Sequence, residues 1–325
     1  HCSGCRSMFL KLFLVMVLLS YLALMSLILG HRFFPSARST PLLRKDTASE
    51  DSTELIVELE NVGKSFDYPV LKGISFKIRQ GETLGVLGKS GSGKSVTLKL
   101  IAGLLKPDVG RILFHGKDIT GMNERELLEL RKRVSYVFQG GAVFDFLNVG
   151  ENIAYPLRER GMKDEKQIKE RVDYLLEAVE LGNIGNLQKP ELSIGAKKQV
   201  AIARAIANDP EVILYDEPTT GIDPIVKKSV NRLIRKLNKQ EHLTSIVVTH
   251  DLKCIEMVAD RIIMLKDGVI HFEGDQEAFH SSPDPYIQAF IAGKRFDEGR
   301  RHNGDVPETG NRRKETEDRR DEERE

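Results

Sequence analysis

A glycine-rich stretch, Gly88-Lys-Ser-Gly-Ser-Gly-Lys-Ser95, combines residue types and spacing that specify phosphate chemistry. It follows a short apolar run, precedes a stretch of helical character and matches the pattern G-x-x-x-x-G-K-[ST]. Phosphate oxygens need several backbone N–H donors at close range, which glycine and a helix N-terminus provide. We expect Lys94 to reach the β- and γ-phosphates and the Ser95 hydroxyl to bind Mg²⁺. The predicted phosphate-binding loop consists of Gly88, Lys89, Ser90, Gly91, Ser92, Gly93, Lys94 and Ser95.

Two acidic residues end a second apolar run, Val212-Ile-Leu-Tyr-Asp-Glu217. A strand that ends in Asp216 places a carboxylate at the carboxyl edge of a parallel sheet, where it can hold Mg²⁺. Glu217 adjoins it and is placed to orient or deprotonate an attacking water. Such a pair usually forms a helix cap or a turn, but the phosphate loop upstream favours the functional interpretation.

Two more polar residues stand at the ends of apolar runs. His250 ends Val247-Val-Thr-His, in the position of a γ-phosphate sensor, and Gln139 follows residues 134–138, where it could contact Mg²⁺ or the water. Either residue alone has an ordinary structural interpretation, and the phosphate loop gives both a chemical one. The candidate catalytic residues are Glu217, His250, Lys94 and Gln139, and the candidate metal ligands are Ser95, Asp216 and Gln139.

The elements that must position these residues alternate along the chain. Buried strands are expected at residues 83–88, 134–138, 211–215 and 244–249. Helical periodicity occurs at residues 125–131, 165–181, 197–207 and 226–237. The alternation predicts an α/β domain with a mainly parallel sheet, and residues 261–272 predict a hairpin that turns at Asp267-Gly268.

Composition narrows the class of protein. The chain has 325 residues, with 49 Lys and Arg against 48 Asp and Glu, so no global basic field supports nucleic-acid binding. Three cysteines and no tryptophan exclude a disulfide scaffold. The composition is therefore that of an ordinary globular domain, apart from its two ends.

The two ends differ in composition from the body at residues 53–293. Residues 1–30 are strongly apolar and fit a signal peptide, a membrane anchor at residues 8–30, or translated sequence that precedes the true start. Nucleotide chemistry requires ATP and disfavours secretion, and the basic residues that follow the segment would keep the body cytoplasmic. Residues 31–52 have the composition of a linker, and residues 294–325 that of a charged, disordered tail.

The motifs together resemble those of ABC-transporter ATPase subunits over about 240 residues. The matching stretches are Gly88–Ser95, Gln139, Leu192-Ser-Ile-Gly-Ala196, Val212–Glu217, Thr220-Gly-Ile-Asp223 and His250. This resemblance implies a P-loop NTPase (RecA-like) core of the ABC type with an antiparallel β subdomain and an inserted α-helical subdomain at about residues 140–205. It implies ATP and Mg²⁺ as cofactors. It further implies that Phe66 stacks on adenine and that Ser193, Gly195 and Asp223 belong to the nucleotide site.

The same resemblance implies partners. A single phosphate loop implies a homodimer with ATP between the subunits, and the helical subdomain would dock onto an integral membrane permease. Residues 138–149 and 151–158 are similar to the Mla/Mce-associated ATPases, which energise phospholipid transport between envelope membranes. We therefore expect a peripheral protein on the cytoplasmic face of the inner membrane, working with an Mce-type lipid-binding protein and with no nucleic acid. The alternatives are a polar-solute importer, a non-transport ABC ATPase and a weakly hydrolysing, ATP-gated structural subunit.

One departure from the family pattern affects turnover. The signature usually reads Leu-Ser-Gly-Gly, and here Ile194 replaces the first of these glycines, while Gln199 stands where Arg is usual. If the position needs a positive φ, isoleucine costs about 1–2 kcal/mol. Because Lys94, Asp216 and Glu217 are present, we favour a tolerated change with slower hydrolysis.

Overall fold

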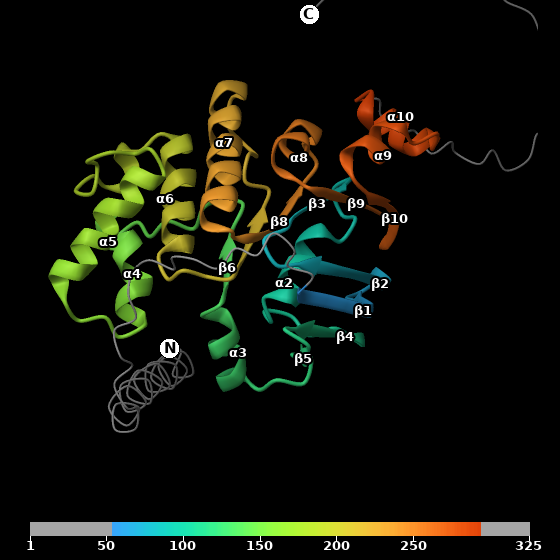
Figure 1. Ribbon diagram of the computed structural model, residues 1–325, viewed down its shortest axis with the longest axis horizontal. Helices are drawn as coiled ribbons and strands as arrows, with labels where there is room; N and C mark the ends of the chain where they lie inside the picture. The colour runs from blue at the N-terminus through green and yellow to red at the C-terminus, as the bar shows by residue number, and fades with distance from the viewer. Residues whose placement is uncertain (1–53, 294–325) are drawn as a thin grey trace, which may run out of the picture. The chain divides into compact units, whose positions relative to one another are not determined.

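Six strands form a sheet in the order β10-β9-β3-β8-β7-β6 within residues 54–293, the part of the chain that the computed structural model describes (Figure 1). The strands are β3 (Thr83–Gly88), β6 (Val134–Val137), β7 (Val212–Asp216), β8 (Thr244–Thr249), β9 (Arg261–Lys266) and β10 (Val269–Gly274). Neighbours from β9 to β6 pair in parallel, and β10 alone runs antiparallel to β9. Both the mainly parallel sheet and the hairpin turn at Asp267-Gly268 are thereby confirmed.

A second sheet is antiparallel, in the order β2-β1-β4-β5. Its strands are β1 (Leu55–Ser65), β2 (Pro69–Arg79), β4 (Val109–Phe114) and β5 (Lys117–Asp118). Along β2, the side chains of Ile74, Phe76 and Ile78 are buried while the residues between them are not, as the two-residue period of a half-buried strand requires. This sheet is the antiparallel part of the expected ABC-type fold.

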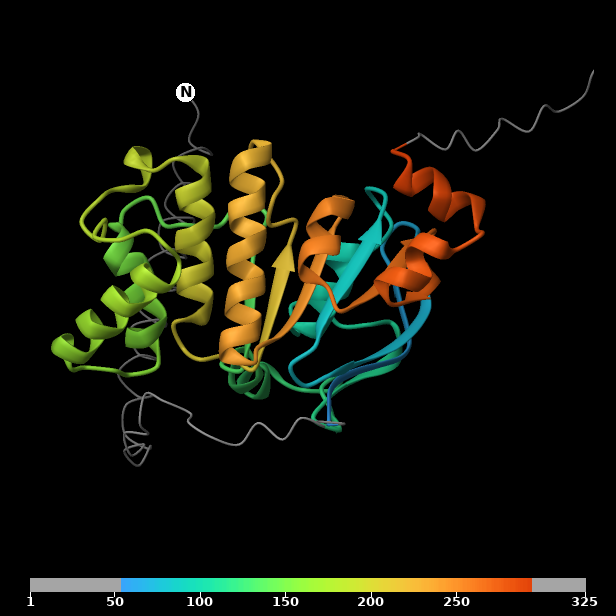
Figure 2. The same cartoon turned by 45° about the horizontal axis from the view of Figure 1, so that its top comes forward.

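The helices are α2 (Lys94–Ile101), α3 (Glu124–Arg131), α4 (Val149–Glu159), α5 (Glu165–Ala178), α6 (Ile194–Ile206), α7 (Pro224–Glu241), α8 (Leu252–Val258), α9 (Gln276–Ser281) and α10 (Pro285–Ile291), with a short 3₁₀ helix at Lys189–Glu191. The helices α4, α5 and α6 pack on one another and form the green and yellow group in Figure 1. Beside α6 stands α7, which Figure 2 shows running alongside it. Within residues 54–293, no helix combines the length and the apolar composition that crossing a bilayer requires. The expectations for residues 1–30, 31–52 and 294–325 lie outside the described residues.

The parallel sheet separates two hydrophobic cores, and consecutive residues of its strands point into different ones. Leu87 and Ile213 pack with the core that contains residues of α4 to α8, whereas Val86 and Leu214 pack with α2 and the antiparallel sheet. Because both faces are covered, all residues of β3, β7 and β8 are buried. The candidate residues Asp216, Glu217 and His250 stand at or directly after the carboxyl ends of β7 and β8.

Candidate functional site

Three parallel strands end side by side at the candidate site. The register pairs Leu87 at the end of β3 with Thr249 of β8, and Asp216 at the end of β7 with Val248 of β8. The phosphate loop after β3, the Asp216-Glu217 pair after β7 and His250 after β8 therefore meet at one edge. Ligands collect at this edge in open parallel sheets.

The N-terminus of α2 differs from the other helix N-termini. Among the α-helices of residues 54–293, α3 to α10 are each capped by an Asn, Asp or Ser side chain, whereas the cap of α2 is Gly93, which has none. Gly93 has a φ of 100°, which glycine adopts without strain. The first N–H groups of α2 are therefore left for a ligand.

The loop before α2 has the features of an anion cradle. A Cβ atom on Gly88 would lie 2.5 Å from the Ser92 hydroxyl oxygen and 2.6 Å from the Leu265 carbonyl oxygen, so only glycine fits there. The Ser92 hydroxyl is buried and has no hydrogen-bond partner within the described part of the chain. A buried polar group without a partner is costly unless a ligand satisfies it. The cradle therefore fits a polyphosphate group.

Lys94 supplies positive charge to this cradle. Its Nζ donates hydrogen bonds to the carbonyl oxygens of Gly88 at 2.8 Å and Lys89 at 3.0 Å. Burial lowers the pKa of Lys94, while the carboxylates of Glu217 and Asp216 act in the opposite direction. The Nζ lies 3.9 Å from the Glu217 carboxylate, so the lysine stands between the loop and the acidic residues.

Asp216 receives a hydroxyl donor at each carboxylate oxygen. Ser95 Oγ donates to Oδ1 at 2.7 Å, and the Tyr136 hydroxyl donates to Oδ2 at 2.8 Å. Carboxylate and hydroxyl oxygens are the ligand types that Mg²⁺ prefers, together with substrate phosphates. Ser95 and Asp216 therefore fit the Mg²⁺ site expected from the sequence, whereas Tyr136 was not anticipated.

Glu217 is held by several donors in an unusual backbone conformation. Thr249 Oγ1 and Thr220 Oγ1 donate to Oε2 at 3.0 and 2.9 Å, and His250 Nδ1 lies 3.0 Å from the carboxylate. Its φ of 48° is in the left-handed region, where a residue other than glycine costs about 1–3 kcal/mol. Backbone strain of this kind occurs at functional sites. The structure thus brings Glu217, His250 and Lys94 together as the sequence predicted, and it adds the two threonines.

The other predicted residues stand apart from this cluster. Gln139 is exposed, and its backbone carbonyl oxygen accepts a hydrogen bond from Lys198 Nζ. Phe66 is 55% exposed, with Lys64 Nζ 5.6 Å from its ring centroid. Ser193 and Asp223 are exposed N-cap residues of α6 and α7.

The signature residue Ile194 is not strained. It is the first residue of α6 and is absent from the residues with positive φ, so the conditional cost of 1–2 kcal/mol considered above does not arise. Its side chain is 56% exposed. The next residue, Gly195, is constrained instead, because a Cβ there would lie 2.5 Å from Val226 Cγ1 where α6 and α7 meet.

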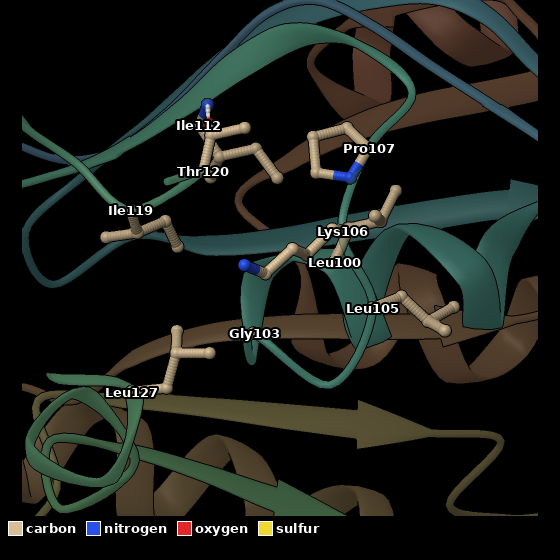
Figure 3. Close-up of a pocket in the computed structure, with 9 residues that line it drawn as sticks. All are labelled: Leu100, Gly103, Leu105, Lys106, Pro107, Ile112, Ile119, Thr120 and Leu127. Carbon is tan, nitrogen blue, oxygen red and sulfur yellow. Dashed lines mark hydrogen bonds between the residues drawn. The ribbon is translucent and has the colours of Figure 1, made fainter. Parts of the chain in front are cut away.

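A small pocket between α2, α3 and the antiparallel sheet is not part of this site (Figure 3). It is lined mainly by apolar side chains such as Leu100, Ile112 and Leu127. Its hydroxyl group, Thr120 Oγ1, accepts a hydrogen bond from the Ile112 N–H. The lining also includes Lys106 but no carboxylate, so the pocket lacks the acidic groups that nucleotide hydrolysis needs.

A parallel sheet with an uncapped, glycine-rich helix start and an adjacent Asp-Glu pair defines a P-loop nucleoside triphosphatase. Comparison with known proteins agrees with this class of protein and identifies the family within it. The ABC transporter family matches residues 71–220. The chain is 40% identical over 267 residues to Protein TRIGALACTOSYLDIACYLGLYCEROL 3, chloroplastic, of Arabidopsis thaliana, covering 77% of each chain.

Two bacterial relatives point to different transporters. The intermembrane phospholipid transport system ATP-binding protein MlaF of Haemophilus influenzae is 39% identical, over 74% of this chain and 91% of its own. The sulfate/thiosulfate import ATP-binding protein CysA of Methylococcus capsulatus is 40% identical, over 76% and 71%. The dimeric post-hydrolysis structure of the ATP-binding cassette MJ0796 with ADP and Pi matches with a TM-score of 0.63 and 34% identity, covering 68% of this chain and 98% of that one. The chain belongs to the ABC transporter family; it is an ATP-binding subunit similar to the Mla ATPases and an ATP hydrolase.

Proposed function

We propose that this ATPase energises phospholipid transport between envelope membranes through an integral permease. The observation that carries the proposal is the segment at residues 138–158, whose sequence resembles the Mla/Mce-associated ATPases and which exposes aromatic side chains. Phe138, Phe146 and Tyr155 are 41%, 79% and 42% exposed. Exposed apolar groups gathered in one segment are typical of a protein-docking surface.

The aromatic segment is preorganised. The Phe144 ring packs against Phe146 and Tyr155, with centroids 5.5 and 5.1 Å apart. Asn152 is fully buried, accepts a hydrogen bond from the Phe144 N–H and donates to the Phe144 and Leu147 carbonyl oxygens. A surface that is already ordered loses less conformational entropy on binding. These features support docking of the permease at this segment.

A homodimer completes the nucleotide site in this proposal. The chain has a single phosphate loop, and the related MJ0796 cassette is dimeric with ADP and Pi bound. Ser193 and Asp223 lie exposed at helix N-termini, where a second subunit can reach them. Ser193 and Gly195 would then offer a hydroxyl and a backbone N–H to the γ-phosphate held by the partner subunit.

The other residues of the site bind the nucleotide or act in its hydrolysis. Phe66 stacks on the adenine, and Lys94 stabilises charge on the transferred phosphoryl group. Mg²⁺, when bound, would neutralise charge on the phosphates; Ser95 and Asp216 would hold it, with Gln139, which stands apart from them in this structure, as a further candidate ligand.

Glu217 is held by His250, Thr220 and Thr249 and orients or deprotonates the attacking water. Hydrolysis then opens the dimer, and the permease converts this opening into lipid movement.

The proposal also implies where the protein is located and which partners it has. A subunit of this kind sits peripherally on the cytoplasmic face of the inner membrane, with a permease and an Mce-type lipid-binding protein. It does not bind nucleic acid, which agrees with the net charge of +1. A second candidate function is import of a polar solute, since the CysA importer subunit is as similar as MlaF.

Purification of the native complex tests the proposal. The chain would be tagged at its C-terminus and isolated from native membranes in mild detergent, and its co-purifying proteins and lipids identified by mass spectrometry. We expect a permease, an Mce-type protein and stoichiometric phospholipid. A permease with a soluble solute-binding protein would instead establish the importer, and recovery without any permease would contradict both.

A further inference from the structure

We propose that Tyr136 is a positioning residue for the divalent-cation site. Its hydroxyl fixes the Asp216 carboxylate so that Oδ1 faces Ser95, and its ring connects that carboxylate to Phe138 beside Gln139. The inference rests on the proposed role of Ser95 and Asp216 in Mg²⁺ binding and adds a residue to which the sequence assigned no role.

The sheet register places Tyr136 and Asp216 on the same face. Tyr136 of β6 pairs with Leu214 of β7, and Asp216 follows two residues later in the same strand. Alternate residues of a strand share a face, so Asp216 lies on the face of Leu214. Leu214 packs in the core that contains α2 residues, and α2 carries Ser95. The geometry therefore brings the three side chains together from β6, β7 and α2.

The two hydroxyl donors together fix the carboxylate. With only the Ser95 hydroxyl, the plane of the Asp216 carboxylate could turn, because a single hydrogen bond leaves its orientation free. The Tyr136 hydroxyl occupies Oδ2 at 2.8 Å while Ser95 occupies Oδ1 at 2.7 Å, so rotation would break both bonds. Hydrogen bonds to a charged acceptor are stronger than neutral ones. The tyrosine thus holds Oδ1 toward the Ser95 side of the site.

The tyrosine ring connects the carboxylate to the segment that carries Gln139. The rings of Tyr136 and Phe138 lie 4.3 Å apart at an interplanar angle of 32°. Phe138 immediately precedes Gln139, whose backbone carbonyl oxygen accepts a hydrogen bond from the buried Lys198. One aromatic pair therefore packs between the Asp216 carboxylate and the backbone segment that carries Gln139.

Binding of a fluorescent, non-hydrolysable ATP analogue (MANT-AMPPNP) tests the proposal. Affinity would be measured in EDTA and in saturating Mg²⁺ for the wild-type protein and for Tyr136→Phe, which keeps the ring and removes the hydroxyl. We expect the affinity in EDTA to stay within about twofold of the wild type and the Mg²⁺-dependent gain to fall about tenfold, or about 1.4 kcal/mol. Tyr174→Phe, at an exposed position of α5, is the matched control and should keep the full gain.

Two further variants separate the possible failures. If Asp216→Asn abolishes the gain while Tyr136→Phe keeps it, the positioning role of Tyr136 is wrong and the metal role of Asp216 stands. If neither variant changes the gain, the proposed metal role itself fails. If Tyr136→Leu loses the Mg²⁺-dependent gain in affinity and Tyr136→Phe keeps it, the ring contributes only by packing. That result would overturn the role of the hydroxyl. Thermal melting of each variant confirms that it is folded.

Discussion

Replacing Ile194 by glycine restores the usual signature residue and should raise ATP hydrolysis. The residue begins α6 directly after Ser193, which caps the helix by accepting a hydrogen bond from the Ala196 N–H at 3.1 Å. In the proposed dimer this N-terminus faces the partner's nucleotide, and the 56% exposed isoleucine side chain stands in the way of close approach. Its removal leaves Ser193 and the N–H groups of α6 unchanged.

The magnitude follows from the position of the residue. Glycine is a poorer helix former than isoleucine by about 0.5 kcal/mol. Loss of a side chain that is a little less than half buried costs about 1 kcal/mol more. We therefore expect the melting temperature to fall by about 3–6 °C. The hydrolysis rate should nevertheless rise by about threefold to tenfold, which corresponds to about 0.7–1.4 kcal/mol in the activation barrier.

Steady-state phosphate release at saturating ATP is the assay, with Ile194→Ala as the matched control. Alanine removes most of the side chain but keeps good helix propensity, so it should recover most of the rate increase with less loss of stability. An increase seen only with glycine would indicate backbone flexibility instead of side-chain obstruction. An unchanged or lower rate in Ile194→Gly would refute the idea that this isoleucine slows hydrolysis.

Two more changes follow from the contacts at and near the site. Lys94→Ala should weaken ATP binding by about tenfold to a hundredfold, because it removes a buried cation from the phosphate loop; fluorescent-nucleotide titration measures this. Burial raises the pKa of Asp251, but its hydrogen bonds and the ion pair with Lys227 at 2.8 Å outweigh burial and lower the pKa overall. A lowered carboxyl pKa stabilises the fold above the unfolded value of about 3.8 and loses that effect as the pH falls through the folded value. Lys227→Met should therefore lower the free energy of unfolding by about 0.5–1 kcal/mol at pH 7 and by progressively less below pH 4, as measured by urea unfolding. An equal loss of stability at pH 7 and below pH 4 would contradict the ion-pair explanation.

Local patterns predicted the elements that carry the site better than they predicted helix starts. The buried strands at residues 83–88 and 244–249 were found because short apolar runs bounded by turns are distinctive. In contrast, α6 begins at Ile194, ahead of the periodic stretch at 197–207, because Ser193 caps it. The helix α4 has a capping box at Asn148 and Glu151 that periodicity alone did not reveal.

The contacts between distant parts of the chain could not be predicted. The motifs identified Asp216 and Glu217, but the donors Tyr136 and Thr249 reach them only through the order of the strands in the sheet. A hydroxyl-bearing residue in a strand has many possible roles, and sequence spacing does not distinguish them. The backbone conformation of Ile194 likewise depends on its place in α6 and not on the family pattern.

ATP-dependent dimerisation of the Glu217→Gln variant tests the central claim most directly. This substitution keeps the acceptor oxygen for Thr249 and Thr220 but removes the carboxylate that acts on water, so hydrolysis should fall by about 10²- to 10⁴-fold while ATP still binds. In sedimentation-velocity experiments we expect a monomer without nucleotide and a stable dimer with Mg²⁺ and ATP, and a return to monomer when Ser193→Arg is added. A protein that stays monomeric with ATP bound, or that hydrolyses ATP at the wild-type rate, would contradict a shared site in which Glu217 acts on the attacking water.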